Sequence, residues 1–298
     1  MPYLLLSIFF STSLVVILRL FSIWKIKTEH GILFNYLVCC ITGFIVMPDK
    51  TMFNHIGIWN GWWVCLLLGG GFILTFLLIG KSTNLLGVAT TGIAFKLSFV
   101  IPTIVAILFY GDKFSITKMI GIAMAVFAVF LIADSKENNV ITEVTEKISE
   151  PTDFIHRKAW IMPFLIFIGS GITDSIFNFI QRNYTPTGYE HLVTTLVFLG
   201  AFLMGLLLFG FNRELYQWKN VLGGILLGVP NYASLYFLLL ALKKSTLPPS
   251  ELFPINNLGI VGFTAICGLI LFKEKFSLRK SIGFALALGS IIIIGFLS

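Results

Sequence analysis

Charged residues are scarce in this sequence. They make up only 12% of its 298 residues, whereas hydrophobic residues make up 57%. A soluble domain is typically about a quarter charged. Together with a mean hydropathy of +0.93, the scarcity of charge excludes an ordinary soluble protein. It predicts an integral membrane protein that lies almost entirely in the bilayer.

The chain also lacks the residue patterns that enzymes and nucleotide-binding proteins need. The four histidines are scattered over separate loops and helix ends, and the four cysteines lie inside apolar runs without metal-ligand spacing. A glycine-rich loop followed by Lys-Ser or Lys-Thr, which would cradle phosphates, is missing. We therefore expect no catalytic residues, no metal and no cofactor.

The N-terminal segment has neither a basic start nor a small-residue cleavage site, so we interpret it as a first span and not as a removed signal peptide. The formal charge of +7 does not indicate a nucleic-acid partner, because Lys and Arg in short loops fix the orientation of membrane proteins. The expected surroundings of the chain are the lipid bilayer.

Ten apolar stretches are each long enough to cross a membrane, which takes about 20 residues. They are residues 2–21, 31–47, 60–80, 84–110, 115–133, 159–182, 187–211, 218–242, 248–272 and 277–297. Only the segment 134–158 has the composition of a soluble region, and it leaves no room for a catalytic domain.

An internal repeat is the strongest pattern present. Residues 111–133 read GDKFSITKMIGIAMAVFAVFLIA, and residues 273–295, 162 positions later, read KEKFSLRKSIGFALALGSIIIIG. Nine of the 23 aligned positions are identical, and Asp112 aligns with Glu274. Each copy has small residues four apart (Gly121 with Ala125, Gly283 with Ala287). Because this spacing lets helix backbones approach closely, we expect these two spans to be structural and to pack on each other.

The repeat predicts the fold class: an all-α membrane protein of ten transmembrane helices in two five-helix repeats. The halves would be residues 1–133 and 159–298, joined by the polar linker 134–158. Because five is an odd number, the second half would be inverted relative to the first. Membrane proteins of this construction are typically transporters, since alternating access needs two similar bundles that move about a shared site.

The loops differ in basic charge. Loops that follow odd-numbered spans carry 14 Lys and Arg, whereas even loops carry 6. The positive-inside rule then places the odd loops in the cytoplasm and both termini outside.

The ends of the fourth and ninth spans resemble those of the drug/metabolite transporter superfamily, within it the EamA-type proteins. They read SFVIPTIVAILFYGDKFS (98–115) and TAICGLILFKEKFS (264–277), each followed by an Ile-Gly helix. The resemblance covers the whole chain and implies ten spans and transport of small organic molecules. It also implies that both termini lie in the cytoplasm, against the charge count, so the orientation stays open.

Lys96 is a charged residue near the middle of the fourth span. Charges at this depth are costly, about 2.5–3.5 kcal/mol on insertion scales, and usually face a cavity or a partner. Pro102, six residues on, removes a helix hydrogen bond and should free the carbonyl of Ser98. We expect Lys96 to contact an anionic part of a substrate. The alternatives are a structural pair with an acid or a side chain that reaches the interface.

The sixth span carries a polar stripe. Ser170, Asp174 and Asn178 recur every four residues and so share one helix face. Ser11, in the first span, aligns with Asp174 at an offset of 163. We expect Asp174 to pair with Lys96 or to act as a proton-coupling carboxylate, with purely structural pairing as the alternative.

Three asparagines complete the candidate site. Asn231 follows Pro230 in the eighth span, and Asn256 and Asn257 follow Pro254 in the ninth. Prolines near these positions predict distorted helices that line a cavity. Asparagine also joins helices by hydrogen bonds, which is the alternative for these residues.

The sequence therefore predicts a secondary transporter that moves an amino-acid-like or anionic small molecule across the cell inner (plasma) membrane. A flippase for a lipid or lipid-linked sugar and a non-transporting scaffold are the alternatives. The substrate, the direction, the coupling ion and the choice between monomer and homodimer stay open.

Overall fold

The computed structural model describes residues 2–47, 51, 59, 61–109, 115–133, 160–184, 190–209, 217–244 and 249–297. The predicted linker 134–158 lies outside these residues. The helices are α1 (Pro2–Ile23), α2 (Thr28–Val46), α3 (Trp62–Leu86), α4 (Val88–Leu97), α5 (Val100–Phe109), α6 (Ile116–Ala133), α9 (Met162–Asn183), α10 (Glu190–Phe209), α11 (Trp218–Lys244), α12 (Pro249–Leu271) and α13 (Leu278–Phe296).

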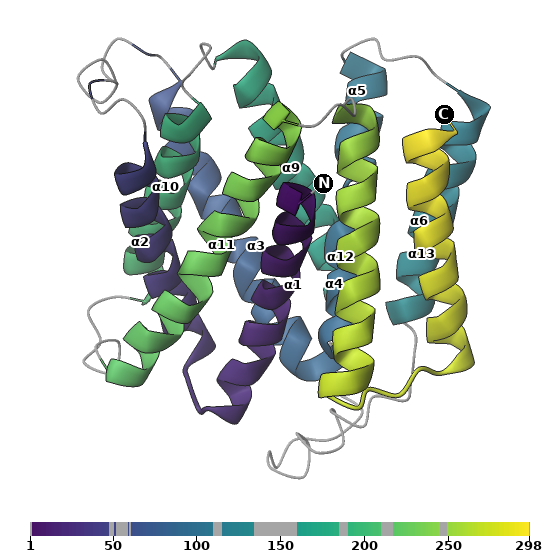
Figure 1. The fold of residues 1–298 in the computed structure, drawn as a ribbon, viewed down its shortest axis with the longest axis horizontal. Helices are drawn as coiled ribbons and strands as arrows, with labels where there is room; N and C mark the ends of the chain where they lie inside the picture. The colour runs from purple at the N-terminus through teal and green to yellow at the C-terminus, as the bar shows by residue number, and fades with distance from the viewer. Residues whose placement is uncertain are drawn as a thin grey trace.

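The part of the chain that is described is helical and arranged as one bundle (Figure 1). Nine of its helical segments are long and apolar enough to cross a membrane, with α4 and α5 counted as one segment, and α12 adds a shorter apolar stretch, Ile255–Leu271. Helices dominate because a bilayer offers no partner for backbone polar groups, which must bond within the segment. The all-helical prediction is thus confirmed.

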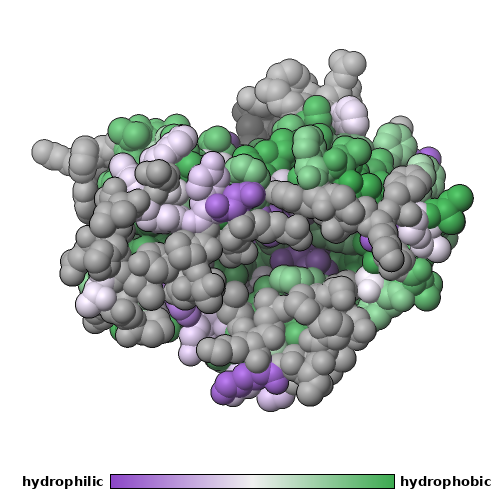
Figure 2. Space-filling view, turned by 90° about the horizontal axis from the view of Figure 1, so that it is seen from above, coloured by the Kyte–Doolittle hydropathy of each residue, from purple (hydrophilic) through white to green (hydrophobic). Residues whose placement is uncertain are grey.

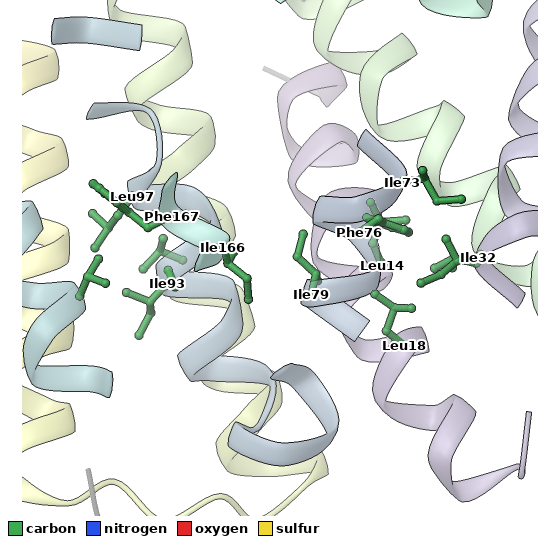
Figure 3. Close-up of a cluster of buried hydrophobic side chains, with 14 of the residues drawn as sticks. Leu14, Leu18, Ile32, Ile73, Phe76, Ile79, Ile93, Leu97, Ile166 and Phe167 are labelled. Carbon is green, nitrogen blue, oxygen red and sulfur yellow. The ribbon is translucent and has the colours of Figure 1, made fainter. Parts of the chain in front are cut away.

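The core lies between the helices and consists mainly of branched aliphatic side chains. Figure 3 shows Ile93 and Leu97 of α4 beside Ile166 and Phe167 of α9, all of them buried. Many large apolar side chains point outward instead, including Leu207 at 81% exposure. In a membrane protein this outer surface faces lipid.

The predicted fourth span, 84–110, begins in the last turn of α3 and, over the residues that are described, continues as two helices, α4 and α5, and not as one kinked helix. α3 continues to Leu86, and α4 begins only after Gly87, whose φ of 94° lies in the left-handed region that glycine adopts readily. α4 and α5 are separated at Ser98 and Phe99. The expectation of a free Ser98 carbonyl is wrong, because it accepts a hydrogen bond from the backbone N–H of Ile101 at 3.0 Å.

α6 and α13, the two repeat helices, pack against each other at one edge of the bundle (Figure 1), as predicted. A Cβ on Gly121 would lie 2.5 Å from Cγ1 of Ile294, and one on Gly283 would lie 2.8 Å from Cγ2 of Ile132. The two contacts are equivalent in the repeat, because Gly283 lies 162 positions after Gly121 and Ile294 lies 162 positions after Ile132. Ser290 also donates a hydrogen bond to the Gly121 carbonyl at 2.8 Å.

Candidate functional site

Lys96 lies in the last turn of α4, immediately before the break between α4 and α5. Its ammonium group lies 4.5 Å from the centre of the Phe95 ring, within the range of a cation–π contact. The carbonyl end of α4 carries a partial negative charge that favours a cation at this position. The half-buried Lys96 therefore lies at an interruption of the helix, next to groups that favour a cation.

Asp174 lies on α9, which packs against α3, α4 and α5. Its carboxylate lies within range of electrostatic attraction to Lys96, but no contact of ion-pair length joins these two described residues. The two charges that the sequence singled out therefore lie in the same region of the bundle. Asp174 is half-buried, as Lys96 is, so both side chains keep a partly open surface.

The rest of the α9 stripe changes steadily in exposure. Ser170, one turn before Asp174, is 1% exposed, whereas Asn178, one turn after it, is exposed. The stripe therefore runs from the interior of the bundle toward its edge. The Oγ of Ser170 is buried and has no hydrogen-bond partner among the described residues.

Three more buried oxygens share this property within the described part of the chain. They are Oδ1 of Asn84 in the last turn of α3, Oγ1 of Thr12 on α1, a residue that is 1% exposed, and Oδ1 of Asn256 on α12, a residue that is 4% exposed. Buried polar atoms are rarely without a partner, and each exception requires an explanation such as a water or ligand. α1, α9 and α12 all pack against α4, so three of these four orphaned oxygens come from the helices that surround Lys96.

Asn257 and Ser11 complete the predicted set on these helices. Asn257 is half-buried on α12, and Ser11 is 8% exposed on α1. Figure 2, which views the molecule from the upper end of Figure 1, shows a hollow near the centre with hydrophilic side chains in its depth. Apolar side chains are also visible beside these hydrophilic ones, and small-molecule sites typically combine an apolar lining with a few polar groups that orient the ligand.

The structure places Asn231 in a different polar cluster. Its Nδ2 donates to Oδ1 of Asn35 on α2 at 3.1 Å, and the Cys39 thiol donates to the Gly228 carbonyl at 3.4 Å. Asn35 is fully buried. Sequence reasoning missed it, although a single asparagine in the apolar run ILFNYLVCC is a signal for a buried polar contact.

A small crevice lies beside this second cluster, between α10 and α11. It is lined by His191, Thr194, Tyr232, Leu235 and Tyr236. The rings of Tyr232 and Tyr236 are stacked with their centres 6.5 Å apart. The tyrosines of α11 thus line a crevice separate from the Lys96–Asp174 pair, and the two rings also pack on each other.

Comparisons with known proteins support the fold and add no activity. No protein-family model matches the sequence. A protein of Haemophilus influenzae (strain ATCC 51907 / DSM 11121 / KW20 / Rd), described only as uncharacterized, is 25% identical over 301 residues, which cover 100% of this chain and 98% of that protein. One crystal structure of a protein aligns with a TM-score of 0.53 and 15% identity over 98% of this chain and 99% of the other. The chain thus has the helices of a multi-pass membrane protein in an arrangement already known among solved structures.

Proposed function

We propose that this protein is a secondary transporter that moves a small anionic or amino-acid-like molecule by alternating access. The observation that carries the proposal is that two charged residues, Lys96 and Asp174, lie within electrostatic range of each other beside a helix interruption inside the bundle. Charged groups at this depth usually mark a substrate or ion pathway. A helix broken near the membrane centre is a recurring feature of transporter sites.

The inverted repeat belongs to the same proposal. Its support is the reciprocal contact of α6 and α13, in which the glycine of each copy meets the isoleucine of the other. A contact of this kind is what a pseudo-two-fold axis between the halves produces. The resemblance to EamA-type proteins agrees with it, and the inner (plasma) membrane is the proposed location.

The test of substrate class is thermal unfolding of the detergent-purified protein against a library of metabolites. A ligand that binds only the folded state stabilises it by mass action and so raises the melting temperature. At a ligand concentration of 100 times the Kd, the free energy of unfolding rises by about 2.7 kcal/mol. We expect anionic or zwitterionic molecules to raise the melting temperature, whereas neutral molecules of the same size leave it unchanged. A hit should then exchange across the membrane of proteoliposomes.

A lipid flippase is the second candidate, and one observation favours it. Asn178 is exposed on α9 beside Phe179, which is 44% exposed and faces outward. A polar residue on an outer face fits a headgroup that slides along the bundle. If soluble metabolites leave the melting temperature unchanged and lipids with polar headgroups raise it, transport of soluble molecules is contradicted and the flippase replaces it.

Asp174 is the candidate for proton coupling, and replacing it separates binding from coupling. In Asp174→Asn the amide keeps the size of the carboxyl group and does not exchange a proton. We expect this variant to exchange substrate across proteoliposomes and to lose accumulation driven by a pH gradient. Gradient-driven accumulation at the wild-type rate would contradict the role of Asp174 in coupling.

A further inference from the structure

The turn between α3 and α4 is held at its α4 side by an acid from the other half of the chain. The Glu274 carboxylate, in the connection between α12 and α13, accepts hydrogen bonds from the backbone N–H groups of Val88 (2.5 Å) and Ala89 (3.2 Å). These N–H groups open α4 and have no partner inside it. A carboxylate is also favoured there by the helix dipole.

A basic residue holds the α3 side of the same turn. Arg19, near the end of α1, donates from Nη1 to the backbone carbonyl of Asn84 at 2.6 Å, in the last turn of α3. A cation at the C-terminus of one helix and an anion at the N-terminus of the next are both placed as the helix dipoles favour. Through these hydrogen bonds the α3–α4 turn is linked both to α1 and to the connection between α12 and α13.

The position of Glu274 is built into the surrounding backbone. A Cβ on Gly87 would lie 2.5 Å from one carboxylate oxygen, and a Cβ on Gly268 would lie 2.7 Å from the other. The backbone N–H of Glu274 donates to the Gly268 carbonyl at 2.9 Å, next to Lys273 with its left-handed φ of 51°. The carboxylate therefore occupies space that a side chain at either of these two glycines would fill.

We propose that these contacts of Arg19 and Glu274 with the α3–α4 turn, the Glu274 clamp, form the gate at this end of the transport path. Directly inside the clamp, Ser82 and Thr91 share a hydrogen bond of 2.8 Å and are both fully buried. The path is therefore closed at the clamp, the lower end of Figure 1, whereas Figure 2 shows a hollow at the opposite end. The inference rests on the proposed transport function.

The clamp is suited to open and close. Hydrogen bonds to charged groups contribute about 1.5–3 kcal/mol each, and about 1.4 kcal/mol changes an equilibrium tenfold. The loss of one such bond therefore shifts a closed–open equilibrium by roughly ten- to a hundredfold. α4 begins at the clamp and carries Lys96 in its last turn, so a movement of its first turn is transmitted to the site.

The test measures access to Ser82 and to Asn257 with a membrane-impermeant thiol reagent. Each position is replaced by cysteine singly, in protein whose four native cysteines are alanine, reconstituted in proteoliposomes labelled from each side. We expect Glu274→Gln to raise labelling at position 82 from the clamp side about tenfold and to lower labelling at position 257 from the opposite side. Gly87→Ala, whose Cβ displaces the carboxylate, should do the same.

Glu29→Gln is the matched control, because Glu29 is an acid in the first turn of α2 at the same end of the bundle, outside the clamp. It should leave both labelling rates unchanged. An unchanged rate at position 82 in both clamp variants would overturn the proposal. A rise at position 82 without a fall at position 257 would show a helix cap that does not gate the path. The labelling needs no substrate, so its failure is distinct from a failure of transport.

Discussion

Lys96→Ala should strongly reduce the stabilisation of the protein by its ligand. The ammonium group lies half-buried at the α4–α5 break, within electrostatic range of Asp174 and among helices that carry unpartnered buried oxygens. A hydrogen bond to a charged group contributes about 1.5–3 kcal/mol, so the affinity should fall by roughly ten- to a hundredfold. The measurement is the ligand-dependent rise in melting temperature, compared between the wild type and the variant.

Two other lysine variants separate charge from position. Lys96→Arg keeps the charge and should retain part of the ligand response. Lys81→Ala removes an exposed lysine of α3 and should respond to ligand as the wild type does. A Lys96→Ala protein that melts far lower without ligand and still binds it with wild-type affinity would contradict the binding role. Lys96 would then be the structural partner of Asp174.

The location of the helices could be predicted from the sequence because a segment that crosses the bilayer must be apolar and must satisfy its own backbone hydrogen bonds. Apolar runs of span length can only be helices there, and the structure has a helix within each predicted span. The helix ends were harder, since α3 continues through Lys81 to Leu86. Proline marked the irregularity near Pro102, but the break at Ser98 and Phe99 depends on how α4 and α5 pack against other helices.

Contacts between distant helices could be predicted only where a repeat revealed them. The α6–α13 packing follows from matching small residues in the two copies. Asn231, by contrast, bonds to Asn35, 196 residues away, and one sequence does not show which helix faces which. The sequence marks Glu274 only as a repeated acid, because its partner, the start of α4, is 186 residues away.

A backbone-to-backbone contact between α3 and α10 predicts a large loss of stability in Gly200→Ala. α3 and α10 touch through their backbones: a Cβ on Gly200 would lie 2.6 Å from Cα of Leu66, and one on Gly69 would lie 2.5 Å from the carbonyl carbon of Gly200. Small residues permit this approach in membranes. A methyl group there can be accommodated only by moving a backbone, at a cost near or above the upper end of the usual 1–3 kcal/mol for overpacking.

Gly262→Ala is the matched control, because a Cβ on this α12 glycine would have nothing within 4 Å. Alanine is better than glycine in a helix by about 0.8–1.0 kcal/mol, so this variant should be as stable as the wild type or more so. The measurement is thermal unfolding of both variants in the same detergent. Gly200→Ala at wild-type stability would contradict the backbone contact of α3 and α10, because helix propensity alone offsets only about 1 kcal/mol of the clash.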